Sequence, residues 1–275
     1  MRQIDVYNPF GGPVYHEETV GSTMDVSRTI AGSGAPHGAV ITADYQEKGR
    51  GRTRGRVWNT ERGENLLFTI LLRYPRIEDI PAALTLRAGL AVSLAIEDFA
   101  PPLAGKTLIK WPNDIMLLVG AGIDLPGVGA LGANAPVKKA AGIFADADGG
   151  SVHIGIGVNM AQKQFPGPLR GKATSIGIAA GMEFASADRF VLLEKILARL
   201  HAEFAAENSR GWKEKIESRL YKKGEQVSFA AGVADDNGSG KIVTGILAGI
   251  GSQGELLLKD ENGVNAFVTG ELVMA

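Results

Sequence analysis

The chain lacks cysteine, which excludes disulfide bonds, thiolate catalysis and cysteine-ligated zinc. Its four histidines are scattered without metal-ligand spacing, so a metal enzyme is disfavoured. The net charge is −1 over 275 residues, which implies no general affinity for nucleic acid or anionic membranes. The longest apolar runs, Leu66–Leu72 and Ala88–Ile96, fall far short of the roughly 20 residues of a membrane helix.

Several motifs are also missing. The sequence has no recognisable Ser/His/Asp arrangement, no Walker-type phosphate loop and no Rossmann glycine pattern, which argues against a P-loop ATPase or a dehydrogenase. Met1–Pro13 carries no apolar core of a secretion signal. We therefore expect a cytoplasmic protein that does not bind a membrane.

Glycine, in contrast, is abundant: 37 residues, roughly twice the average usage of about 7%. Apolar residues make up 45% of the chain, enough for a sizeable core. After Lys223-Gly224 the sequence pattern changes to short segments of alternating apolar and polar residues, separated by Gly, Asp and Asn. This pattern is typical of a small antiparallel barrel. The sequence predicts two domains, residues 1–220 and 221–275.

The most unusual stretch is Tyr45–Trp58, where four arginines and one lysine against Glu47 give a local charge of +4. Glycines alternate with the arginines, so the backbone can turn and present N–H groups between guanidinium groups. The pattern suits a loop that closes over a phosphate-bearing ligand, although a solvated basic loop or a nucleic-acid patch has the same signature. Two β-type runs, Ala39–Asp44 and Leu66–Leu72, flank this stretch and would anchor it to one sheet.

The remaining segments predict a mixed α+β domain. Ser22-Thr23-Met24-Asp25 fits a capping box at the start of a helix. The other predicted elements, read from periodicity and turn signals, are strands at Val14–Glu18 and Thr107–Trp111, a hairpin of Lys139–Asp146 with Val152–Asn159, and helices at Pro81–Phe99, Asp188–Ala206 and Ser209–Leu220. Val119–Val137, rich in Gly and Ala, reads as an insertion between strands.

Two features of these elements concern a site. Lys110 lies near a strand end, where it would point a cation above the sheet; a surface lysine is the alternative. In Val152–Asn159, Gly155 and Gly157 share one face, where missing side chains leave room for a ligand or another backbone. A site of fixed cations without an obvious general base or nucleophile suits phosphoryl or nucleotidyl transfer.

Four blocks together resemble the signature of biotin protein ligases: Gly49–Trp58, Lys110–Asp114, Ala141–Ile143 and Gly155–Met160. They occur in that family's order, and the resemblance runs from about Val14 to the C-terminus. It implies a mixed sheet flanked by helices plus an SH3-like C-terminal barrel. It also implies the monofunctional type, since Met1–Pro13 is too short for the DNA-binding domain of other members.

The resemblance implies two-step chemistry. Biotin attacks the α-phosphate of ATP, accompanied by Mg²⁺, to give biotinyl-5′-AMP, and the biotinyl group then passes to a lysine of a biotin carboxyl carrier protein. Lys110, Arg50 and Arg52 would be catalytic. The implied biotin-binding residues are Ser22, Thr23, Gln46, Arg50, Gly51, Arg52, Lys110, Gly142, Gly155 and Gly157. The implied ATP-binding residues are Arg50, Arg52, Arg56, Trp58, Lys110, Asn113 and Asn159, and no residues are implied as dedicated metal ligands.

The chain departs from the family pattern at several places. The arginine block has one residue more than usual at Thr53-Arg54, Met24 replaces a common Asn, and Asp146 stands where Glu is common. A lipoate-type ligase, a non-catalytic paralogue that binds biotin or its adenylate, and a nucleic-acid binder are the alternatives. Val152–Asn159, read as an exposed strand, is a candidate for pairing across a homodimer.

Overall fold

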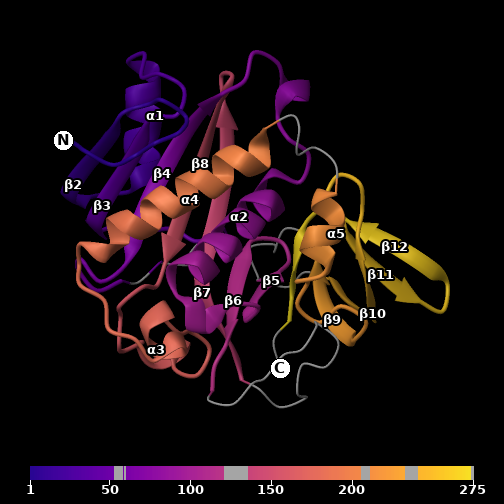
Figure 1. Ribbon diagram of the computed structural model, residues 1–275. Helices are drawn as coiled ribbons and strands as arrows, with labels where there is room; N and C mark the ends of the chain where they lie inside the picture. The colour runs from indigo at the N-terminus through magenta and orange to yellow at the C-terminus, as the bar shows by residue number, and fades with distance from the viewer. Residues whose placement is uncertain (53–57, 59, 121–135, 206–210, 233–240, 274–275) are drawn as a thin grey trace.

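The computed structural model describes residues 1–52, 58, 60–120, 136–205, 211–232 and 241–273, and these form two sheets with helices (Figure 1). The larger sheet has eight strands in the order β1-β2-β3-β4-β8-β7-β6-β5. Its strands are β1 (Arg2–Ile4), β2 (Val14–Val20), β3 (Val40–Gln46), β4 (Leu66–Arg73), β5 (Thr107–Lys110), β6 (Asp114–Leu118), β7 (Val137–Asp148) and β8 (Ser151–Val158). Only β2 and β3 among these neighbours pair in parallel, so the predicted mixed sheet is confirmed.

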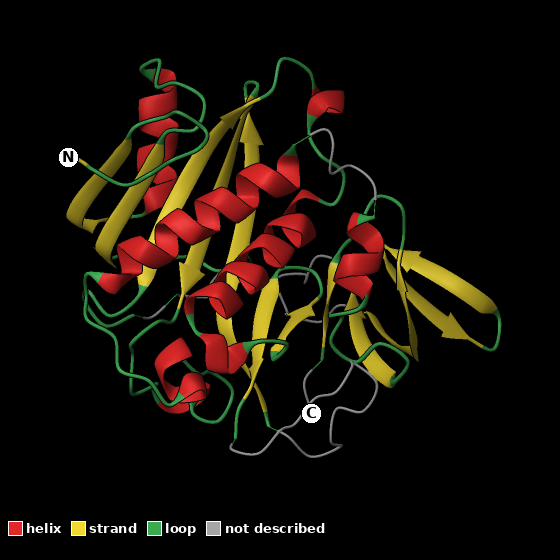
Figure 2. Ribbon diagram, in the orientation of Figure 1, coloured by secondary structure: helices red, strands yellow, loops and turns green. Residues whose placement is uncertain are grey.

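Two long helices cover one face of this sheet. In Figure 2, α2 (Leu84–Phe99) and α4 (Asp188–Phe204) run side by side across the strands. Both helices share one apolar core with β4 and β8, in which Ile154, Ile156 and Val158 take part. Because side chains alternate along a strand, Gly155 and Gly157 lie on the opposite face, as predicted. That face packs against α1 (Thr23–Gly32), which places the start of α1 above the glycines.

Helix α2 is a long helix whose middle is buried and mainly apolar. The segment Ile77–Phe99 is long and apolar enough to cross a membrane by length and composition alone, but 56% of its apolar 18-residue stretch is buried within the protein. This burial is what a core helix requires. The regular helix begins at Leu84 rather than at Pro81, after Ala83 adopts a left-handed conformation with φ 53°.

The hairpin of β7 and β8 turns at Gly149 and Gly150, both with positive φ, as the Asp-Gly-Gly signal predicts. Strand β8 is not an exposed edge, however, because it bonds to β4 on one side and β7 on the other. The prediction that it could pair across a dimer is therefore wrong. The insertion joins β6 to β7, and its residues 121–135 lie outside the described part.

The remaining helices are short. They are η1 (Ile77–Asp79), η2 (Pro101–Leu103), η3 (Gly167–Leu169), α3 (Ile176–Ala180) and α5 (Trp212–Glu217). Helix α5 covers only the middle of the predicted Ser209–Leu220, because Ser218–Leu220 leave the helix and Leu220 forms a bridge with Ile109 of β5. This bridge ties the end of the first predicted domain to the edge of the large sheet.

The C-terminal segment forms an antiparallel sheet of five strands in the order β12-β11-β10-β9-β13. The strands are β9 (Gln226–Ala231), β10 (Lys241–Ile250), β11 (Leu256–Asp260), β12 (Gly263–Phe267) and β13 (Gly270–Leu272). The change of sequence pattern after Gly224 thus coincides with the start of the second sheet. The short β13, which the sequence did not reveal, pairs with β9 and lies next to the arginine stretch.

Candidate active site

The predicted site residues come from five places that meet on the glycine face of the large sheet and at its β5 end. They lie at the start of α1, at the end of β3 with the adjoining loop, at the β5–β6 turn, on β7 and on β8. The arrangement brings most of the predicted residues together. Arg56, with Thr53 and Arg54, lies outside the described residues.

Gln46, the last residue of β3, binds the first turn of α1. Its Oε1 accepts hydrogen bonds from the backbone N–H of Thr23 at 2.8 Å and from the Thr23 hydroxyl at 3.0 Å. The Thr69 hydroxyl of β4 donates to the Thr23 oxygen at 2.8 Å. This chain of polar groups is preorganised for a ligand that carries both donors and acceptors.

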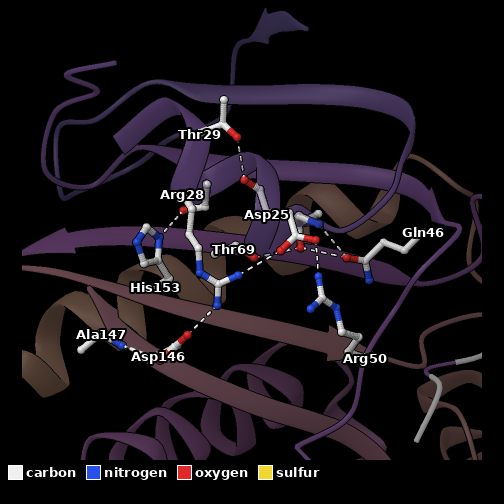
Figure 3. A network of polar contacts seen from close by, with 11 residues as sticks. Asp25, Arg28, Thr29, Gln46, Arg50, Thr69, Asp146, Ala147 and His153 are labelled. Atoms are coloured by element: carbon white, nitrogen blue, oxygen red, sulfur yellow. Dashed lines mark hydrogen bonds and ion pairs between the residues drawn. The ribbon is translucent and has the colours of Figure 1, made fainter. Parts of the chain in front are cut away.

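The capping-box prediction is half right. The helix begins where expected, with Ser22 as N-cap in an extended conformation, but the Ser22 side chain makes no capping hydrogen bond. Asp25 does not turn back to the cap either, because its carboxylate binds two arginines. One oxygen accepts from Arg28 at 2.9 Å, and the other pairs with Arg50 (Figure 3).

Two of the predicted cations, Arg52 and Lys110, line a small pocket at the β5–β6 turn. Lys110 is almost fully buried at its edge, next to the cis Trp111–Pro112 peptide. The pocket is lined by Gly51, Arg52, Lys110, Trp111, Pro112, Asn113, Asp114, Lys139 and Glu271. Arg52 also donates to the carbonyl of Gly270 in β13 at 2.5 Å, so the C-terminal sheet forms part of the wall.

The pocket is small, at about 50 Å³. A nucleotide or a drug-sized ligand requires several hundred cubic ångströms. Lys139 spans one side and pairs with Asp114 at 2.6 Å. Binding of a nucleotide here therefore requires neighbouring side chains to move.

Two further side chains, those of Trp58 and Met24, cover the predicted site glycines Gly142, Gly155 and Gly157. An ideal Cβ on Gly157 would come within 2.8 Å of the Trp58 ring, and one on Gly142 within 3.0 Å. A Cβ on Gly155 would lie 2.9 Å from the Met24 sulfur. The missing side chains thus leave room, as predicted, and in this structure Trp58 and Met24 take it.

Trp58 lies on the glycine face rather than at the surface. Its Nε1 is buried with no hydrogen-bond partner in the structure, and the Lys139 ammonium lies 5.4 Å from its ring. Leaving a buried N–H unpaired costs free energy. The indole therefore packs on the glycine face without a hydrogen bond to its N–H in this structure.

Two residues predicted to bind ATP, Asn113 and Asn159, make hydrogen bonds that stabilise the fold in this structure. The Asn113 side-chain amide donates to the Ile143 carbonyl at 2.8 Å, and the Asn159 amide donates to the Thr174 carbonyl at 3.1 Å. Each holds a turn in place beside the site. Their side-chain N–H groups are therefore engaged by the backbone.

Five residues at the site were not predicted as site residues from sequence: Asp25, Thr69, Asp114, Lys139 and Glu271. Asp25 was assigned to a cap, and Thr69 lay hidden in an apolar run. Asp114 and Lys139 belong to neighbouring strands separated by the long insertion, so their spacing gave no signal. Glu271 comes from the other sheet.

A buried serine–histidine pair was also not predicted from sequence. The Ser27 hydroxyl of α1 lies 2.7 Å from Nδ1 of His153 on β8, and both side chains are fully enclosed. Asp146 is the cross-strand neighbour of His153. Because substrate cannot reach Ser27, the pair joins α1 to the sheet rather than acting as a nucleophile.

Burial lowers the pKa of His153, and the charge of Arg28 lowers this pKa further. Burial also lowers the pKa of His16, against the opposing effect of Asp44. Both imidazoles are thereby favoured in the neutral form. Among the described residues no group of three or more His, Cys, Asp or Glu side chains could hold a metal ion.

Comparison with known proteins gives one family. The model of the "Biotin/lipoate A/B protein ligase family" matches residues 18–158. The bifunctional ligase/repressor BirA of Bacillus subtilis is 30% identical over 94% of this chain and 73% of its own length. A biotin–[acetyl-CoA-carboxylase] ligase of Paracoccus denitrificans is 28% identical over 85% of this chain and 89% of its own.

Among solved structures, the biotin protein ligase of Aquifex aeolicus in complex with biotin and ATP superposes with a TM-score of 0.72. It is 26% identical, and the match covers 94% of this chain and 97% of that one. The likeness thus spans both sheets rather than the large sheet alone.

Proposed function

This chain belongs to the biotin/lipoate A/B protein ligase family, and from this premise we propose how its site performs biotin protein ligation. The relatives that share most of its length are biotin ligases, and so is the superposed structure with biotin and ATP. The chain is accordingly a biotin–protein ligase. The assignment of individual residues to the reaction is our proposal.

The observation that carries the assignment is the cluster of cations beside the glycine face. Arg52, Lys110 and Lys139 line one pocket, and Arg50 lies nearby at the start of α1. A site of this kind suits the meeting of two anions, the biotin carboxylate and the α-phosphate of ATP. The glycine face beside it offers room for an apolar acyl chain.

In the first step, a biotin carboxylate oxygen attacks the α-phosphorus, and pyrophosphate leaves. Lys110 reduces the repulsion between the two anions, while Arg50 and Arg52 bind phosphate oxygens. The backbone of Gly51 lies between these arginines. Asn113 and Asn159 support the nucleotide side of the site, with Arg56 from the undescribed part of the loop.

For the acyl chain and head group, we propose the glycine face and the polar group at the start of α1. Gly142, Gly155 and Gly157 accommodate the valeryl chain once Trp58 moves onto the adenine. The flat indole ring of Trp58 suits such stacking on the adenine. Ser22, Thr23 and Gln46 bind the ureido head group, since donors and acceptors alternate there.

In the second step, the amine of an acceptor lysine attacks the acyl carbon of biotinyl-5′-AMP. An amide bond forms, the mixed anhydride breaks, AMP leaves and the amine loses a proton. Closure of the site over the adenylate keeps water from this reactive anhydride.

The acceptor is proposed to be a biotin carboxyl carrier protein or domain. Magnesium is proposed to enter with ATP, held mainly by phosphate oxygens as is usual for nucleotide-bound Mg²⁺. The proposed cellular compartment is the cytoplasm. The proposed domains are residues 1–220 and 221–275. A homodimer and the absence of nucleic-acid binding remain predictions.

The direct test is pyrophosphate release by the purified protein with ATP and biotin. We expect release that depends on biotin and is much slower with lipoate. Equal release with lipoate would support a lipoate-type ligase. Tight binding of biotin without release would support a non-catalytic binder.

A further inference from the structure

Asp25 has no role in the chemistry above, yet it binds Arg50, which is proposed to meet phosphate. The network in Figure 3 runs from β7 to the arginine stretch through Asp146, Arg28, Asp25 and Arg50. We propose that Asp25 is a positioning residue that holds the Arg50 guanidinium at the mouth of the site and yields it to a phosphate group of the substrate. This inference rests on the proposed function.

The backbone near Arg50 is fixed, so that only its side chain needs to move. The N–H of Glu47 donates to the carbonyl of Val20 at 3.0 Å, and the N–H of Lys48 donates to the carbonyl of Gly21 at 2.8 Å. The carbonyl of Gly49 accepts from the N–H of Trp58 at 3.0 Å. Arg50 follows directly on this anchored segment.

The pair of Arg50 and Asp25 is accessible enough to exchange. The Arg50 side chain is 60% exposed and that of Asp25 is 46% exposed. Ion pairs in such surroundings are weak, because water and salt screen them. A phosphate group offers a guanidinium two parallel charge-assisted hydrogen bonds and therefore competes well with a single carboxylate oxygen.

Asp25 remains satisfied after Arg50 leaves. Its other oxygen keeps the hydrogen bond from Arg28 at 2.9 Å, and Arg28 is in turn held by Asp146 at 2.5 Å. The carboxylate also lies in the first turn of α1, where the helix dipole favours a negative charge. Both arrangements of Arg50 thus leave the charges around it paired.

The test compares binding of inorganic pyrophosphate by wild type, Asp25→Asn, Arg50→Gln and the double variant, measured by calorimetry. Asn keeps the shape of Asp25 but removes its competing charge. We expect Asp25→Asn to tighten pyrophosphate binding about two- to fivefold, the effect of losing an exposed ion pair. The KM for ATP should fall by a similar factor.

In the Arg50→Gln background, Asp25→Asn should change the affinity no more than the control variant does. That control, Glu183→Gln, removes a carboxylate from another exposed ion pair, with Lys163, and so makes the same change in net charge. A merely structural Asp25 would lower the melting temperature without tightening anion binding.

Unchanged or weaker pyrophosphate binding in Asp25→Asn would overturn the proposal, as would equal tightening in the Arg50→Gln background or no binding by wild type. Failure of the proposed function looks different: wild type would then release no pyrophosphate with biotin, whatever the Asp25 variant binds.

Discussion

Lys110 is the residue on which the proposed chemistry depends most. It is 4% exposed, at the edge of a pocket that also holds Arg52 and Lys139. A cation so enclosed acts on nearby anions with little screening by solvent. Its location agrees with the prediction from the strand end at Thr107–Trp111.

Replacing Lys110 with Ala should reduce biotin-dependent pyrophosphate release by about 10²- to 10³-fold, as for loss of one preorganised transition-state contact. The fold should persist, so circular dichroism and the melting temperature serve as controls. Unchanged turnover in a folded variant would remove Lys110 from the mechanism.

His153 gives a second prediction, on pH. The folded protein holds its pKa below the ordinary 6.5, whereas the unfolded chain takes up a proton near that value. The unfolded state then binds more protons, and stability falls as the pH drops below about 6.5. His16, whose pKa is also lowered, adds to this effect.

Asn at position 153 keeps a polar atom near the Ser27 hydroxyl but does not titrate. Between pH 7.5 and 5.5 the melting temperature of His153→Asn should therefore fall less than that of wild type. Urea unfolding at both pH values checks the result. Equal losses in the two proteins would contradict the proposed protonation.

Individual site residues could be predicted from sequence where they belong to a local sequence pattern. Residues that meet only through the pairing of distant strands and helices could not. Lys110, Arg50, Arg52 and the β8 glycines could be predicted as site residues because each belongs to a short, unusual run. Lys139 and Ser27 were not found, since their partners Asp114 and His153 come from other strands.

Strand β8 shows how one element serves both the core and the site. Its two isoleucines and two valines enter the core beneath α2 and α4, and its glycines face α1 and Trp58. An alternating strand can separate these tasks because its side chains point to opposite faces. Alternation is visible in the sequence, but the side chains that fill the space above the glycines are not.

Adding one methyl group at Gly157 should test this face. A Cβ there would lie 2.8 Å from the indole of Trp58, so Gly157→Ala should push the ring away. We expect a loss of about 1–3 kcal/mol of stability, as for overpacked cores. Tryptophan fluorescence should shift, and the KM for biotin should rise.

Gly32→Ala is a matched control, because no atom lies within 4 Å of the added carbon and Gly32 ends helix α1. It should leave fluorescence and KM unchanged. If Gly157→Ala behaves like Gly32→Ala, the indole does not rest on the glycine in solution.

In the whole molecule, Trp111 joins the two sheets. It directly follows Lys110, its indole N–H donates to the carbonyl of Gly254 at 2.9 Å, and its ring meets Phe229 of β9 edge-on at 5.6 Å. The C-terminal sheet therefore packs against the strand end that carries Lys110. Glu271 of the small sheet accordingly lines the same pocket as Lys110.

Trp111→Phe should remove the hydrogen bond to Gly254 and part of the ring contact. We expect a loss of about 1 kcal/mol in the free energy of unfolding, since a half-buried carbonyl loses its donor. The loss in Trp111→Phe combined with Phe229→Leu should be smaller than the sum of the single losses. An unchanged urea midpoint would show that the sheets do not depend on Trp111.

The two-sheet architecture was predictable, whereas the contact between the sheets was not. The change to short alternating segments after Gly224 indicates a second unit from sequence alone. That Arg52 meets Gly270, and that Glu271 lines the Lys110 pocket, depends on docking between segments about 200 residues apart. No local pattern encodes such a contact.

The most direct test of the central claim is the mass of a biotin carboxyl carrier domain after incubation with this protein, ATP and biotin. We predict the gain of one biotinyl group on a single lysine, in a reaction that requires ATP and is not supported by lipoate. No gain in mass with biotin, or an equally rapid gain of a lipoyl group, would contradict the assignment of this chain as a biotin–protein ligase.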